Sequence, residues 1–323
     1  MENFSLRRLR PLAVAGLLLG LLPLAMSPAA LPEATRIVVL AGVPMSLNLL
    51  VGTTGLISMG QGLFAGFGAY VVALATIRYN WSFGAAAALA LGLSLPLSLI
   101  VALVSLRARH LFFSLLTLAI GQVAFVVVSR NYELTGGDDG LVGVGLPAWL
   151  QSDLVQHYVA VFAFVAASGV LLRLLASPFG VTLRAIRDNA DRVASLGGNP
   201  KLYEIAAMVV GGFIATIFGV VWACTEGAVE PGLFSWVTSA LLLMMVALGG
   251  RSMFLGPLFG AVILEASRAS LQRHSANSDI VVGGVVIVCA VFFPEGVGPA
   301  LQRTMARFTG RAAAVTVAGE GSR

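Results

Sequence analysis

Long apolar runs separated by short polar stretches make up most of this chain. The runs are continuous and rich in Ala, Leu and Gly, without the alternation of apolar and polar residues that strands of a membrane β-barrel require. Roughly 20 helical residues cross a bilayer core about 30 Å thick, so the pattern predicts an all-α, polytopic membrane protein with about ten membrane segments. These segments fall near residues 11–30, 37–57, 60–77, 83–105, 111–129, 158–175, 204–224, 235–250, 253–268 and 280–294.

Two of the runs, 235–250 and 253–268, are shorter than the others, so we expect them to be tilted, kinked or re-entrant. Composition agrees with a membrane protein, because 58% of the 323 residues are hydrophobic and only 11% are charged. So little charge cannot cover the surface of a soluble domain of this size.

Charge placement predicts the orientation in the membrane. With the N-terminus inside, 15 of the 20 Lys and Arg residues fall in cytoplasmic segments, as the positive-inside rule requires. Both termini are therefore predicted to be cytoplasmic, and the net charge of +5 reflects topology rather than nucleic-acid binding. The first run, with Arg7–Arg10 before it and Ser27–Ala30 after it, also resembles a cleavable signal peptide. We expect it to be retained as the first helix.

The residues that usually carry enzyme chemistry are few and isolated. His110, His157 and His274 stand apart at predicted membrane boundaries, where we expect solvated side chains and no metal or catalytic role. Cys224 and Cys289 each end an apolar run and have no metal-type neighbours, which favours packing roles.

The chain also lacks a phosphate-binding loop of its own. Such a loop needs a lysine beside a hydroxyl residue, and the single lysine, Lys201, lies between Pro200 and Leu202. This chain is therefore predicted not to hydrolyse ATP itself.

The strongly polar stretch from Ser177 to Tyr203 interrupts the apolar pattern. Pro178 favours a turn, and residues 188–196 can form two helical turns that end at a left-handed Gly197. An isolated helix this short is marginal in water, so docking into a groove of a partner protein would stabilise it. Its charges are Arg184, Arg187, Asp188, Asp191 and Arg192, and the two predicted apolar side chains on one face are Val193 and Leu196.

Region 52–69 is dense in glycine, which allows two interpretations that do not exclude each other. The glycines could let neighbouring helices pack closely. They could also allow an unwound segment that lines a path for a solute. In that case the polar lining would come from Asn48, Thr53, Thr54, Ser58 and Gln61.

Two acidic features remain. Glu265 lies inside an apolar run with Arg268 three residues on, close enough for a helical salt bridge; it is either a functional intramembrane charge or merely interfacial. Loop 131–157 is predicted to be extracytoplasmic and irregular, because Thr135 to Gly145 contains five glycines. The loop could cap the path, contact a binding protein, or serve as a plain connector.

Four segments, in the same order along the chain, resemble LivM-type permeases, the membrane subunits of ABC importers for branched-chain amino acids. They are NLLVG at 48–52 with GLISMGQ at 55–61 and GFGAY at 66–70, ELTGGDDGL at 133–141, SPFG at 177–180 with RAIRDN at 184–189, and LGGR at 248–251 with GPLFGA at 256–261.

The resemblance implies roles for three groups of residues. It makes the polar stretch a coupling helix that docks into an ATP-binding subunit, although family members typically carry glutamate and paired alanines before the loop glycine, where this chain has Asp191–Ala194. The implied coupling residues are Arg184, Arg187, Asp188, Asp191, Val193, Ala194, Leu196 and Gly197; the candidates for the translocation path are Asn48, Thr53, Thr54, Ser58, Gly60, Gln61, Gly66 and Glu265; the candidate binding-protein contacts are Glu133, Thr135, Asp138 and Asp139.

The resemblance also implies the organisation and the partners. Residues 1–300 would form one transmembrane permease domain with a coupling loop at 176–203, and residues 301–323 a cytoplasmic tail. The implied partners are two ATP-binding subunits that carry ATP and Mg²⁺, a second homologous permease, an extracytoplasmic solute-binding protein and the lipid bilayer of a bacterial inner membrane, with no nucleic acid. The chain itself would be no enzyme and would hold no cofactor or metal.

Other functions stay open at this point. A permease for urea or short amides would keep much the same frame. An ion-coupled secondary transporter would need paired intramembrane carboxylates, and the apolar runs offer only Glu265. A structural or receptor membrane protein would not need the charged stretch.

Overall fold

The computed structural model describes residues 2–108, 111–272, 283–284 and 296–299. The chain divides into two compact units, Met1–Leu243 and Met244–Arg323. Most of the predicted segment 280–294 and the predicted tail lie outside the described residues, as do His110, His274 and Cys289.

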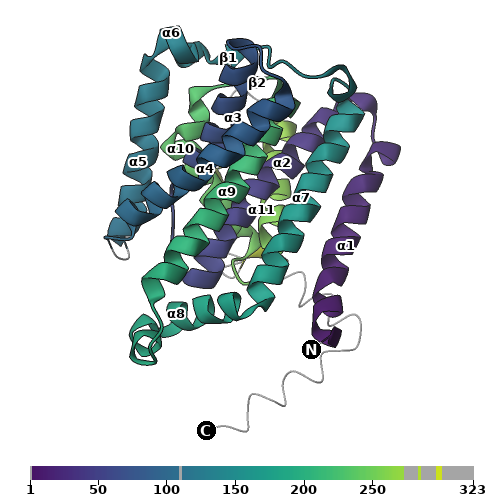
Figure 1. Ribbon diagram of the computed structural model, residues 1–323. Coiled ribbons are helices and arrows are strands. Elements are labelled where there is room, and N and C mark those ends of the chain that lie inside the picture. Colours follow the sequence, from purple (N-terminus) through teal and green to yellow (C-terminus); the bar gives the residue numbers. More distant parts are fainter. Residues whose placement is uncertain (1, 109–110, 273–282, 285–295, 300–323) are drawn as a thin grey trace. The chain divides into compact units, whose positions relative to one another are not determined.

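The described residues are almost entirely helical (Figure 1), which confirms the all-α class. Within these ranges five helices are long and apolar enough to cross a membrane, and several shorter apolar helices accompany them. The ten-segment count and the orientation of the termini stay predictions. The α-helices are α1 (Glu2–Ala25), α2 (Leu31–Asn48), α3 (Gln61–Ile77), α4 (Phe83–Ser105), α5 (Leu111–Arg130), α6 (Tyr132–Thr135), α7 (Asp153–Ala176), α8 (Pro178–Ser195), α9 (Pro200–Glu226), α10 (Trp236–Gly249) and α11 (Gly256–Gln272).

Short elements join these helices. Two-residue strands β1 and β2 pair antiparallel, with Leu141 opposite Val229, and they attach the loop before α7 to the segment after α9. The sequence analysis predicted no strand, because two residues are too few to show an alternating pattern. The short elements are η1 (Pro28–Ala30), the π-helical turn η2 (Leu49–Thr54), η3 (Gly137–Asp139), β1 (Leu141–Val142), η4 (Ala148–Leu150), β2 (Ala228–Val229) and η5 (Pro231–Phe234).

Helix α9 packs closely against α3 in the first unit, with α2 and α4 beside them. Small residues allow this close approach: a Cβ added at Gly219 would lie only 1.9 Å from the Ala65 carbonyl oxygen, and one at Gly68 2.5 Å from that of Thr216. The Thr216 hydroxyl also lies 3.2 Å from the Phe64 carbonyl. Tight packing is therefore one real role of the glycines in region 52–69.

The expectation that His157 is solvated is wrong. The side chain is fully buried and connects α7 to α1 and α2. Its Nε2 lies 3.0 Å from the Leu19 carbonyl oxygen, and its Nδ1 lies 2.9 Å from Thr35 Oγ1. The cause lies in α1: Pro23, four residues after Leu19, has no N–H to offer that carbonyl. The histidine supplies the missing donor.

The contact between α3 and α9 generates a prediction about folding. Gly219→Ala should sharply lower the yield of monodisperse protein and the unfolding temperature in detergent, because the new methyl group meets backbone that cannot rotate away. Overpacking of this kind costs roughly 1–3 kcal/mol. Gly92→Ala in α4 is the matched control, since a Cβ there meets nothing within 4 Å. Equal yield and stability of the two variants would contradict close packing at Gly219.

Candidate functional site

The path from α2 to α3 contains an interruption that we call the helix break (residues 49–60). Helix α2 continues into the π-helical turn η2, and Gly55, with φ 75°, ends it in the left-handed conformation. Residues 55–60 form no helix, and α3 begins at Gln61. The expected unwound segment therefore exists at residues 55–60, whereas residues 61–69 are regular helix.

The polar residues predicted to line a path are buried within this packing. The five polar side chains are each at most 8% exposed. Gln61 Nε2 lies 3.3 Å from Ser46 Oγ, and the Thr54 hydroxyl donates to the Leu50 carbonyl at 2.6 Å. Gly66 lies in α3, where an added Cβ would come within 2.9 Å of the Phe234 ring. The five polar residues are Asn48, Thr53, Thr54, Ser58 and Gln61, and Gly60 is buried with them.

Side chains from two other helices hold the helix break. From α5, the Ser114 hydroxyl donates to the Ile57 carbonyl at 2.5 Å, and Thr117 Oγ1 accepts from the Met59 N–H at 3.0 Å. From α8, Arg187 Nη1 donates to the Gly52 carbonyl at 2.8 Å.

Helix α8 runs across one end of α7 and α9 in Figure 1 and consists of two pieces. Asn189 is extended (φ −163°, ψ 98°), and its Oδ1 accepts from the Arg192 N–H at 2.8 Å. The predicted continuous helix over residues 188–196 is therefore wrong at its start, because Asn189 caps a new helical piece. The first piece buries Leu183 and Ile186, whereas the second piece carries mostly exposed residues.

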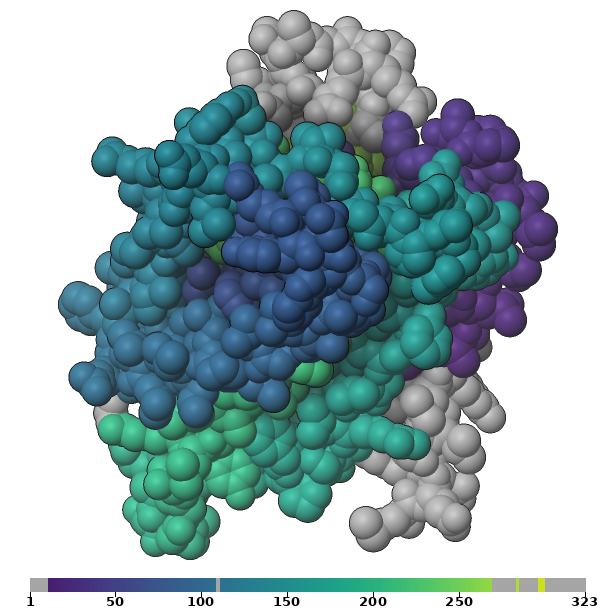
Figure 2. All heavy atoms as spheres, turned by 45° about the horizontal axis from the view of Figure 1, so that its top comes forward, coloured from purple at the N-terminus to yellow at the C-terminus, as the bar shows by residue number. Residues whose placement is uncertain are grey.

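The turn after α8 matches the prediction for Gly197. Its φ is 86°, and its N–H lies 3.0 Å from the Ala194 carbonyl. Leu196 is 83% exposed and Val193 is half-buried, so the two do not share a packed face within this chain. In the space-filling view the green end of α8 and this turn project from the molecule at the bottom (Figure 2).

Loop 131–157 is irregular, as predicted, with positive φ at four glycines, 136, 137, 140 and 143. Glu133, Asp138 and Asp139 are exposed. Thr135 differs from its expected role as a surface contact, because it is only 6% exposed. Its hydroxyl lies 2.5 Å from the Val128 carbonyl and 2.6 Å from that of Asn131, so this side chain holds the loop to the end of α5.

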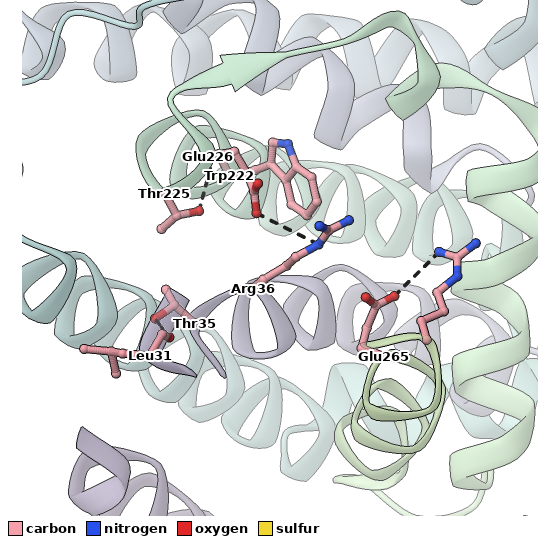
Figure 3. Close-up of polar contacts among 8 residues, drawn as sticks. Leu31, Thr35, Arg36, Trp222, Thr225, Glu226 and Glu265 are labelled. Carbon is pink, nitrogen blue, oxygen red and sulfur yellow. Dashed lines mark hydrogen bonds and ion pairs between the residues drawn. The ribbon is translucent and has the colours of Figure 1, made fainter. Parts of the chain in front are cut away.

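An ion pair that the sequence did not reveal joins α2 to α9. Arg36 Nε lies 4.0 Å from Glu226 Oε1, and the Arg36 guanidinium lies 5.4 Å from the centre of the Trp222 ring, as Figure 3 shows. The two charges are 190 positions apart, Arg36 just before one apolar run and Glu226 just after another, so no local pattern connects them.

An apolar cavity lies next to this ion pair in the first unit. Its volume is about 20 Å³, which is room for about one water molecule, and no polar atoms line it. Trp222 contributes to its wall, and the α2 wall residues follow Arg36 at helical spacing. The cavity is lined by Val39, Leu40, Val43, Gly62, Ala65, Phe218, Gly219, Trp222, Leu233, Thr238 and Leu242.

In the second unit, the predicted salt bridge on α11 is present. Glu265 Oε1 lies 3.8 Å from Arg268 Nη1 (Figure 3), and Glu265 is only 8% exposed. Across the described ranges, no group of three or more His, Cys, Asp or Glu side chains could hold a metal ion.

Comparison with known proteins gives a consistent result. A family model described as "Branched-chain amino acid transport system / permease component" matches residues 31–290. The high-affinity branched-chain amino acid transport system permease protein LivM of Escherichia coli is 26% identical over 292 residues, which cover 82% of this chain and 68% of that protein. The LivM protein of Salmonella typhimurium is also 26% identical, over 305 residues, or 86% and 71% of the two chains.

A permease named for a different solute also matches. The autoinducer 2 import system permease protein LsrC of Photorhabdus laumondii is 24% identical over 267 residues, which cover 80% of this chain and 75% of that protein. No solved structure matches the chain significantly.

Proposed function

The chain belongs to the family of permease components of branched-chain amino acid transport systems, and from this premise we propose that it imports branched-chain amino acids by ATP-driven alternating access. In this proposal it works in a bacterial inner membrane with two ATP-binding subunits, a second homologous permease and an extracytoplasmic solute-binding protein. ATP and Mg²⁺ are held by the ATP-binding subunits.

The observation that carries the coupling role is the exposed second piece of α8. A leucine that is 83% exposed stands beside Asp191 and Arg192, which are also exposed. An apolar tip with charged neighbours fits a groove on another protein better than it fits water. The first piece of α8, which buries Leu183 and Ile186, attaches that tip to the helix bundle.

The ion pair and the apolar cavity support the choice of solute. A branched-chain amino acid carries a carboxylate, an ammonium group and an aliphatic side chain. Arg36 could donate to the carboxylate and Glu226 could accept from the ammonium group, while the aliphatic side chain contacts the apolar wall beside Trp222. Urea and short amides would leave this apolar wall unused and would find no hydrogen-bonding groups in it, which argues against a permease for urea or short amides.

The ion-coupled transporter is also less well supported. Proton or ion coupling within the membrane needs carboxylates that can change charge. In the described part of the chain Glu265 is the one buried carboxylate, and it already pairs with Arg268.

Reconstitution tests the proposed function directly. The purified chain alone should hydrolyse no ATP. Proteoliposomes with all the proposed subunits should take up labelled leucine when ATP is supplied on the side of the ATP-binding subunits, and ADP in its place should give no uptake. Unlabelled isoleucine or valine should compete, and urea should not. Competition by urea without competition by valine would favour a permease for urea or short amides. ATP hydrolysis by the isolated chain would overturn the coupling role.

The turn after α8 gives a second prediction. Gly197→Val should reduce co-purification with the ATP-binding subunit and ATP-dependent uptake, because a side chain at φ 86° costs about 1–2 kcal/mol. Asp191→Arg should act in the same direction, since it reverses a charge near the start of the second helical piece. The control is Gly169→Val in α7, where a Cβ also meets nothing within 4 Å but φ is ordinary. Normal association and uptake in both variants would exclude this turn from coupling.

The third prediction concerns the ion pair. Arg36→Gln and Glu226→Gln should each raise the apparent KM for leucine uptake by about tenfold or more, the usual effect of losing a charge-assisted hydrogen bond. The coupled ATP hydrolysis at saturating solute should change much less. Arg78→Gln is the control, because Arg78 is an exposed arginine at the end of α3. Unchanged KM values in both variants would place the solute elsewhere.

A further inference from the structure

We propose that Arg187 links α8 to the helix break, so that movement of α8 is passed directly to the backbone at Gly52. Arg187 is then a positioning residue inside this chain and not primarily a contact to the ATP-binding subunit. The inference rests on the proposed function, because it concerns how ATP-driven movement reaches the path.

The Gly52 carbonyl needs a partner because the helix ends around it. In a continuous α-helix it would accept from the N–H four residues on, which belongs to Leu56. The Leu56 N–H instead bonds to the Leu50 carbonyl at 3.1 Å. Arg187 Nη1 occupies the vacated position at 2.8 Å. A cation also suits the negative end of a helix dipole.

Two further contacts aim Arg187 at this carbonyl. Its Nε and Nη2 both lie 3.2 Å from Asp188 Oδ1, so Nη1 is left pointing at Gly52. The aliphatic part of Arg187 fits against Gly55, where an added Cβ would lie 2.9 Å from Arg187 Cγ. The left-handed Gly55 that ends the helix therefore also makes room for the arginine.

The same helical piece is fixed to the bundle and to the break. Leu183 and Ile186 are buried and lie on α8 next to Arg187, so the first piece of α8 moves as one body with its arginine. The far part of the helix break is held by α5, through Ser114 and Thr117. A shift of α8 therefore pulls on one end of residues 52–60 while α5 retains the other end.

Arg173 offers a comparison outside the implied coupling residues. It is an exposed arginine in the last turn of α7, just before α8 begins. Arg173→Gln therefore removes the same charge from the neighbouring helix and leaves the bond between Arg187 and Gly52 in place.

The test compares Arg187→Gln with Arg173→Gln in the reconstituted importer. In Arg187→Gln, co-purification with the ATP-binding subunit and ATP hydrolysis should remain within about twofold of wild type, whereas solute moved per ATP should fall by about tenfold. Arg187→Lys should recover little, because an ammonium group cannot hold Asp188 and Gly52 in the same fork. Arg173→Gln should move as much solute per ATP as the wild type.

A second readout follows the helix break itself. Ile57 is 46% exposed, so Ile57→Cys, in a chain whose two cysteines are replaced, can be labelled with a water-soluble maleimide. The labelling rate should depend on ATP in the wild-type background and in Arg173→Gln, and lose that dependence in Arg187→Gln. If Arg187→Gln gives no folded protein, Gly55→Ala takes its place in the test. Its methyl group would displace the Arg187 side chain from the Gly55 backbone, so this variant should also move less solute per ATP.

The outcomes separate the two proposals. The proposed link between α8 and the helix break would be overturned if Arg187→Gln moved a normal amount of solute per ATP and kept ATP-dependent labelling. The same holds for Gly55→Ala if it replaces Arg187→Gln in the test. Loss of co-purification in Arg187→Gln would also overturn it, since Arg187 would then be a docking contact. A wild-type assembly that shows no ATP-dependent uptake would instead overturn the proposed function.

Discussion

Backbone groups that leave a regular helix must find other hydrogen-bond partners. This constraint explains the arrangement around residues 49–60. The carbonyls of Gly52 and Ile57 and the N–H of Met59 have left the regular helical ladder, and each bonds to a side chain from α8 or α5. The break is therefore held by helices that are distant in the sequence, and its shape depends on where they stand.

The neighbouring glycines serve a different purpose, although they are close in the sequence. Gly68 of α3 lies against α9, and Gly219 of α9 lies against α3, with backbone atoms in the space a side chain would need. These contacts fix α3 to α9 just after the chain has left the break. A segment that leaves the helical ladder thus precedes a closely packed helix.

Much of this was predictable from the sequence, for physical reasons. Residues 83–105 were predicted as a membrane segment and form α4 with the same ends. The polar residues on either side of this continuous apolar run fix where the helix begins and ends. Gly197 was predicted in the left-handed conformation because a polar helix ended there. The salt bridge between Glu265 and Arg268 followed from helical spacing alone.

What escaped the sequence analysis depends on tertiary contacts. His157 was misplaced because its partner, the Leu19 carbonyl, becomes available only through Pro23 in another helix. Thr135 was predicted as a surface contact, yet its hydroxyl turns inward to hold its own loop. Asn189 interrupts α8 by capping the next piece, a competition between side chain and backbone that a charge pattern does not reveal.

Helix α2 gives the two proposed functional regions a common element. Arg36, which pairs with Glu226, lies near its beginning, and Gly52, which accepts from Arg187, lies in the turn that continues it. The whole helical stretch from Pro28 to Thr54 has 27 residues and would extend over about 40 Å at the usual helical rise. A displacement at one end is passed along this stretch, in which Pro44 removes one backbone hydrogen bond. If α8 moves Gly52, Arg36 must move relative to α9 unless the π-helical turn yields first. Since Gly52 lies inside that turn and Arg36 lies before it, the stiffness of the turn determines how much of a shift in α8 reaches the ion pair.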